Sequence, residues 1–114
     1  MDELRQLITQ GLLGSWDIIE LGAEHAAHPT IELRQNGSFS LWWDETGVQA
    51  EGALLVPTGN WRVVDGPAVQ LMNFELPPTA LIALPRIWRI VESADNTRKM
   101  VTPGAKVYMW HRRS

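Results

Sequence analysis

The sequence predicts an all-β fold, an antiparallel up-and-down barrel of about eight strands with one short N-terminal helix. Three observations lead to this prediction. Short apolar segments recur at intervals of roughly ten residues along most of the chain. Gly, Pro, Asn and Asp separate these segments, and these are the residues of tight turns. The one convincing helical period lies near the N-terminus, so no helices remain for the crossovers that parallel strands require.

Residues 2–12 have the pattern of an amphipathic helix. A single apolar stripe is formed by Leu4, Leu7, Ile8 and Leu12. Asp2 and Glu3 fall in the first turn, where negative charge favours the helix dipole. Gly14 provides a stop. We expect this helix to plug one end of the barrel.

From residue 16 onward the apolar period changes to two, which is typical of strands. Eight or nine short strands are predicted, at residues 16–21, 30–35, 38–43, 48–56, 60–64, 68–74, 85–92, 98–102 and 105–113. Asn36-Gly37 is the strongest hairpin signal, because both residues tolerate positive φ. The apolar stretch at residues 79–84 has no firm place in this scheme. Closing such strands into a barrel removes the exposed edges that invite aggregation.

One domain covers residues 1–114, since the chain has the length of a common single domain. It contains no cysteine, so a disulfide framework is excluded. The N-terminal residues lack the basic start and apolar run of a signal peptide, and no apolar run is long enough to cross a bilayer. We therefore expect a cytoplasmic protein with no membrane partner.

Charge is distributed unevenly along the chain. Residues 1–57 carry nine acidic and two basic residues, whereas residues 58–114 carry four acidic and eight basic residues. The net charge of −3 lacks the basic excess of nucleic-acid-binding domains, so no nucleic-acid partner is expected. The two halves can attract each other across a barrel or across a dimer interface.

The sequence contains no recognisable catalytic motif. It has no nucleophile motif, no phosphate-binding glycine loop and no paired acids, so we expect neither enzymatic activity nor a cofactor. His25 and His28 lie three residues apart, but Pro29 disfavours the helix that would bring both to one metal ion. His111 has no partner histidine near it on the last strand. No metal site is therefore predicted.

Aromatic residues are the candidates for a binding site. Trp42 and Trp43 are adjacent on one strand and must face opposite sides. If Trp43 faces inward, Trp42 is exposed and becomes a candidate interface residue. The candidate ligand-binding residues inside the barrel are Arg34, Trp43, Trp61, Trp88 and Tyr108. Arg34 would orient an acidic head group, and Glu20 is the matching inward acid if Trp16 faces inward. A ligand cavity and a packed aromatic core are both compatible with this pattern.

Gly14-Ser15-Trp16 follows the predicted helix and opens the first strand, and Arg112-Arg113 ends the last strand. With the succession of hairpins between them, this arrangement resembles the lipocalin-like, or calycin, group of small β-barrels, in a trimmed bacterial form. The resemblance implies a barrel floor built from Gly14, Trp16 and Arg112 or Arg113, with the guanidinium stacked over the indole. The chain lacks the length, signal peptide and disulfide of secreted lipocalins.

The preferred function is non-enzymatic binding of a small apolar or amphipathic ligand inside the barrel. The alternative is a protein–protein interaction module, such as a homodimer that uses Trp42, with a packed barrel and no ligand.

Overall fold

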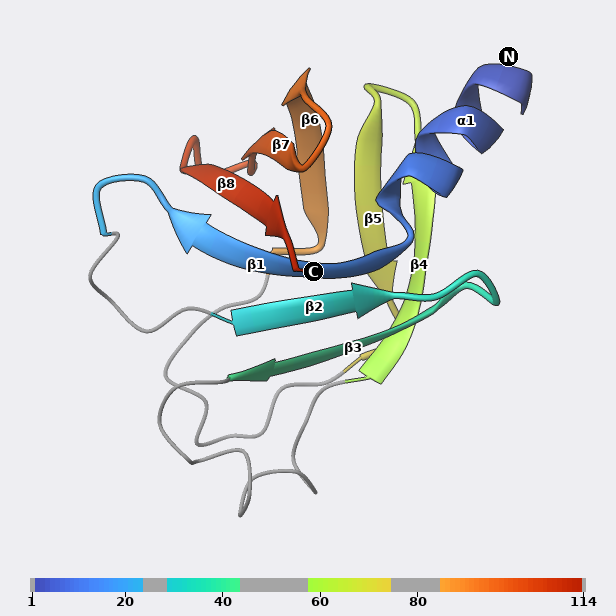
Figure 1. Ribbon diagram of the computed structural model, residues 1–114, viewed down its shortest axis with the longest axis horizontal. Helices are drawn as coiled ribbons and strands as arrows, with labels where there is room; N and C mark the ends of the chain where they lie inside the picture. Colours follow the sequence, from blue (N-terminus) through green and yellow to red (C-terminus); the bar gives the residue numbers. More distant parts are fainter. Residues whose placement is uncertain (1, 24–28, 44–57, 75–84, 114) are drawn as a thin grey trace.

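The chain folds into a closed barrel of eight antiparallel strands preceded by one helix (Figure 1). This computed structural model describes residues 2–23, 29–43, 58–74 and 85–113, with the backbone alone for residues 2, 42, 43 and 58. The elements are α1 (Asp2–Leu12), β1 (Gly14–Glu20), β2 (Pro29–Leu33), β3 (Ser38–Trp43), β4 (Thr58–Val64), β5 (Ala68–Met72), β6 (Ile87–Ser93), β7 (Thr97–Val101) and β8 (Val107–Arg112). The predicted fold class is confirmed.

Each predicted strand within the described residues has a counterpart, and each boundary shifts by at most two residues. The last strand begins at Val107 because the residues before it form a turn. In that turn Ala105 has a positive φ of 63°, and its amide donates to the Thr102 carbonyl. The predicted strand at residues 48–56 and the apolar stretch at residues 79–84 lie outside the described residues.

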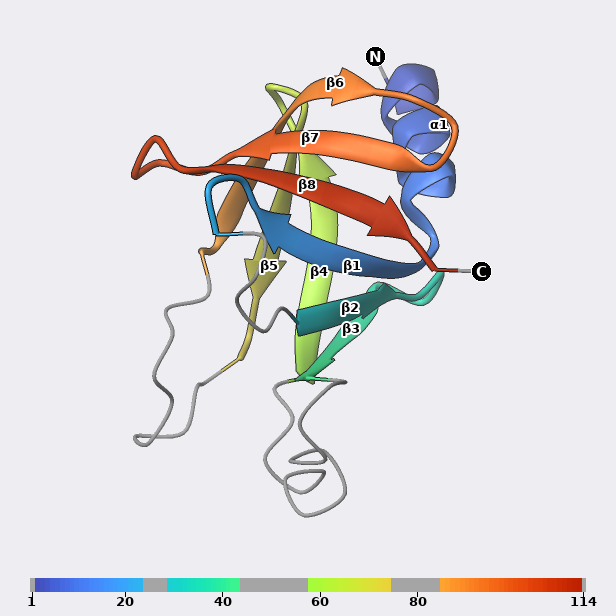
Figure 2. The same cartoon turned by 60° about the vertical axis from the view of Figure 1, so that its left-hand side comes forward.

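Every strand pairs with the next along the chain, and β8 returns to pair with β1. The closing register runs from Trp16 opposite Arg112 to Glu20 opposite Tyr108. Because α1 leads directly into β1, the barrel has a helix end and a far end, where β1, β3, β5 and β7 terminate (Figures 1 and 2). The turns β2–β3, β4–β5 and β6–β7 lie at the helix end.

Alternate residues along each strand point into the barrel and form its core. In β1, Trp16 and Ile18 are buried, whereas the intervening Asp17 is only partly buried. The fully buried large apolar side chains of the described residues are Trp16, Trp88, Trp110, Phe39, Leu12, Ile31, Leu33, Leu41, Leu71, Met100 and Val69. Burial of each large apolar side chain contributes about 1.5–3 kcal/mol, so this interior is the main source of stability.

The helix uses only part of its apolar stripe against the barrel. Leu12 is buried and Ile8 packs against the core, but Leu4 and Leu7 are 61% and 66% exposed. The first turns of α1 lie beside the turn between β4 and β5, where Arg5 forms an ion pair of 3.1 Å with Asp65. The plug is therefore the C-terminal half of the helix.

Gly59 of β4 is required by a close approach between strands. It pairs with Phe39 of β3, and a Cβ at this position would lie 2.4 Å from the Met72 carbonyl oxygen and 2.9 Å from the Phe39 ring. No residue with a Cβ fits at this position without displacing the backbone of β5.

Substitution Gly59→Ala is expected to destabilise the protein by about 2 kcal/mol or more, because the new methyl group must displace backbone atoms. Gly104→Ala is the matched control, since a Cβ there meets no atom within 4 Å. Chemical denaturation of both variants provides the measurement. Equal unfolding midpoints for the two variants would contradict the close approach.

Candidate functional site

The helix end of the barrel is closed around Trp16. The Trp16 indole nitrogen donates a hydrogen bond of 2.8 Å to the Leu12 carbonyl at the end of α1. The Arg112 guanidinium carbon lies 4.3 Å from the centroid of the Trp16 ring, within the range of a cation–π contact. The stacking that the lipocalin-like resemblance implies is thus present in the structure, and the arginine that makes it is Arg112.

Arg112 also binds the C-terminal end of α1. Its two terminal nitrogens donate to the carbonyls of Leu13 and Gly11, each at 2.6 Å. The last carbonyls of a helix have no intrahelical partner and carry the negative end of the helix dipole, so a guanidinium satisfies both needs. Gly14 permits this arrangement, because it has a φ of 115° and a Cβ there would lie 3.0 Å from an Arg112 nitrogen.

Arg98 of β7 adds a second guanidinium to the same end. It lies 5.1 Å from the Trp16 ring centroid and donates to the Gly11 carbonyl at 3.2 Å. Burial, and then the positive charge of Arg112, lower the pKa of Arg98, while Asp95 acts in the opposite direction. Arg98 is not among the residues predicted from the sequence to close the barrel, although its pairing with Trp110 across β7 and β8 places it on the inner face.

Arg113, the other candidate for the stack, lies on the outside of the barrel. It forms an ion pair of 3.6 Å with Asp17 and donates to the Thr30 hydroxyl at 3.3 Å. Strand alternation explains the difference, since consecutive residues point to opposite faces.

Four aromatic rings form a continuous column through the barrel, which we call the aromatic column: Trp16, Trp110, Trp88 and Tyr108. Successive ring centroids are 6.4, 5.4 and 4.8 Å apart, and the last two contacts are edge-to-face. Such contacts add to area burial by about 0.5–1.5 kcal/mol each. The column begins at the helix end and finishes with Tyr108, which is only partly buried, near the far end.

Trp110 carries an unpaired donor inside this column. Its side chain is 0% exposed, and its indole nitrogen has no hydrogen-bond partner within the described part of the chain. The neighbouring indole nitrogen of Trp88 donates to the Pro85 carbonyl at 2.8 Å. Trp110 is not among the ligand-binding residues predicted from the sequence, although its two-residue spacing from Tyr108 and Arg112 places it on the same face as both.

Glu20 and Tyr108 face each other at the far end, at the last register pair between β1 and β8. Burial raises the pKa of the Tyr108 phenol, and the negative charge of Glu20 raises it further. Glu20 follows Trp16 and Ile18 on the inner face, so the sequence-based expectation of an inward acid agrees with the strand register.

The structure brings together only some of the predicted ligand-binding residues. Trp88 and Tyr108 are in contact, whereas the Trp61 indole is buried and donates to the Arg34 carbonyl at 2.9 Å. The side chains of Trp42 and Trp43 lie outside the described part of the structure, so the interface role of Trp42 and the ligand contact of Trp43 stay predictions.

The prediction that Arg34 contacts a ligand inside the barrel is wrong. It follows Leu33, which faces inward, and its own guanidinium donates to the Glu32 carboxylate at 2.9 Å and to the Ser40 hydroxyl at 2.7 Å. These partners belong to the outer face, because they alternate with the buried Ile31, Leu33, Phe39 and Leu41. An arginine on this face does not reach a ligand inside the barrel.

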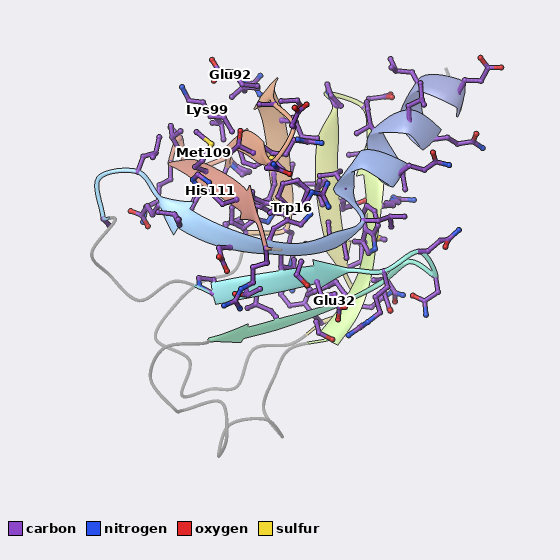
Figure 3. The ribbon with its side chains drawn as sticks, viewed as in Figure 1. Trp16, Glu32, Glu92, Lys99, Met109 and His111 are labelled. Carbon is purple, nitrogen blue, oxygen red and sulfur yellow. The ribbon has the colours of Figure 1, made fainter. Side chains whose placement is uncertain are left out.

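The outer wall of β6, β7 and β8 has a shallow cleft of about 430 Å³. It is lined by Glu92, Ser93, Ala94, Thr97, Lys99 and Met109. Figure 3 shows Glu92, Lys99, Met109 and His111 along this outer side, with Trp16 inside the barrel. Among the described residues, no group of three His, Cys, Asp or Glu side chains is arranged to hold a metal ion. His25 and His28 lie outside the described residues.

No family model matches the chain, and no curated protein is similar to it in sequence. Its fold is similar to the NMR structure of a protein from Burkholderia xenovorans, with a TM-score of 0.54 and 12% sequence identity. The match covers 95% of this chain and 88% of the other. At this identity the likeness concerns the fold alone. In the part of the chain that the structure describes, no helix is long and apolar enough to span a bilayer.

Substitution Arg112→Met should lower the free energy of unfolding by about 2–4 kcal/mol, because it removes the cation–π contact and the two hydrogen bonds to the carbonyls of Gly11 and Leu13 at the end of α1. Arg62→Met is the matched control, since Arg62 is exposed and, within the described ranges, its side chain bonds to Gln70 on the outer face. Thermal unfolding measures the difference. If both variants unfold at the same temperature, the floor contact contributes nothing to stability.

Trp110→Phe should cost less stability than Trp88→Phe, by about 1 kcal/mol. Both substitutions shrink an equally buried ring, but only the second leaves a carbonyl without its donor. Denaturant unfolding of both variants tests this expectation. A larger loss for Trp110→Phe would show that the Trp110 indole nitrogen has a bonding partner after all.

Proposed function

We propose that this protein is a non-catalytic binding protein, which takes a small apolar or amphipathic ligand at the far end of a lipocalin-like barrel. The observation that carries the proposal is the aromatic column, which ends in a partly buried Tyr108 at the end opposite the helix. An eight-stranded barrel has an interior that is either just filled or holds one small ligand.

The helix end is filled by Trp16, Arg112, Arg98 and the last turns of α1, so it offers little room for a ligand. The far end supplies what a ligand site usually combines, which is aromatic surface with a few polar groups. The partly buried Tyr108 provides ring surface there, with the buried Trp88 packed against it, and Glu20 and the Tyr108 hydroxyl provide the polar groups.

The alternative proposal is an interaction module that forms a homodimer. It is favoured by the exposure of Leu4 and Leu7, which leaves an apolar strip on the first turns of α1 uncovered. Trp42, which the sequence predicts as an interface residue, would belong to a second contact surface.

Native mass spectrometry of freshly purified protein tests both proposals, with 1-decanol as the added probe. A carried mass that disappears on denaturation, or a one-to-one decanol adduct, is the result expected of the binding protein. A dimer without adducts that fails to take up decanol would favour the interaction module. A Leu4→Ser and Leu7→Ser double variant should convert that dimer to monomer, since it removes the exposed strip.

A further inference from the structure

We propose that the far end of the barrel selects ligands with a cationic head group, through Glu20 and the aromatic ring of Tyr108, which packs against the buried Trp88. This inference rests on the proposed binding function and names the ligand class. It reverses the polarity that the sequence analysis expected, in which Arg34 would hold an acidic head group.

Glu20 supplies a carboxylate at the far end of the barrel. Glu20 occupies the last position of β1 on the face of Trp16 and Ile18, and it is only partly buried. Its carboxylate forms no ion pair or hydrogen bond with any residue in the described segments. A carboxylate at the edge of an apolar interior lowers its free energy when a cation approaches it, because the surrounding protein screens charge less than water does.

An aromatic ring lies beside the Glu20 carboxylate. Tyr108 lies directly opposite Glu20 across β1 and β8, and its ring packs edge-to-face against Trp88 at 4.8 Å. Aromatic faces attract cations through the ring quadrupole, and indole and phenol rings do so best. Carboxylate and rings therefore favour the same ligand charge.

The basic side chains of the protein itself have other partners or lie apart from Glu20. Arg98 and Arg112 are engaged at the helix end, and Arg34 bonds to outer-face partners. At the far end, the other charged residues within the described ranges are Arg86, Arg89 and Lys106. Arg86 lies 4.4 Å from the Phe74 ring centroid, Arg89 is exposed opposite Val101 at the end of β7, and Lys106 is exposed in the β7–β8 turn. None of the three is paired with Glu20, so within the described residues no cation neutralises its carboxylate.

Three probes with the same alkyl chain separate the head-group effect from the apolar effect: decyltrimethylammonium, 1-decanol and decanoate, each below its micelle-forming concentration. Isothermal titration calorimetry at low salt should show decyltrimethylammonium binding roughly tenfold more tightly than 1-decanol, with decanoate weakest. Added KCl should reduce the preference, since it screens the carboxylate.

Glu20→Gln should remove the preference for decyltrimethylammonium while leaving 1-decanol affinity within about twofold. Glu32→Gln is the matched control, because it removes the same charge from the outer face and should leave all three affinities unchanged. If Glu20→Gln does not fold, Tyr108→Leu and the salt dependence of the unaltered protein decide, since both should weaken the preference for the cation.

The possible outcomes distinguish a failure of ligand binding from a failure of cation selection. If none of the three probes binds, the proposed binding function is overturned. If the probes bind with equal affinity or decanoate binds most tightly, binding stands and cation selection is overturned. Identical behaviour of the Glu20→Gln and Glu32→Gln proteins would also overturn it, because the preference would then arise elsewhere.

Discussion

The contact of Arg112 with Trp16 and with the end of α1 is the interaction on which the barrel depends. One guanidinium lies over the indole that fills the helix end and also bonds to the carbonyls of Gly11 and Leu13. It comes from the last strand, whereas its partners belong to the helix and the first strand. It therefore ties the two ends of the chain together at the seam where β8 meets β1. The Gly14 conformation makes room for it.

The aromatic column is built on this floor. Trp16 supports Trp110, Trp110 contacts Trp88, and Trp88 contacts Tyr108 near the far end. The two ends of the column differ in charge, because two guanidiniums lie at the helix end and a carboxylate lies at the far end. The positive end is occupied by helix carbonyls, whereas the negative end has no cation bonded to it in the described structure. This asymmetry gives the interior a direction along which a ligand with a polar head would orient.

Alternate residues of each strand have different roles on the two faces of the barrel wall. Inward positions form the core, and outward positions form small polar networks such as Arg34 with Glu32 and Arg113 with Asp17. These outer pairs are partly exposed and contribute little to stability. Among the buried side-chain nitrogen and oxygen atoms of the described residues, the Trp110 nitrogen is the one without a hydrogen-bond partner, and an unsatisfied buried donor costs about 1–3 kcal/mol.

The sequence by itself determined the strand succession, the helix, the all-β class and the Gly14–Trp16 segment, because these depend on local period and turn chemistry. It also placed Glu20 on the Trp16 face, since alternation within one strand needs no tertiary information. Only the tertiary structure decided that Arg112 rather than Arg113 covers Trp16 and that Arg98 lies beside it at the helix end. Those choices depend on the register between strands far apart in the chain, and a shift of one residue would reverse each of them.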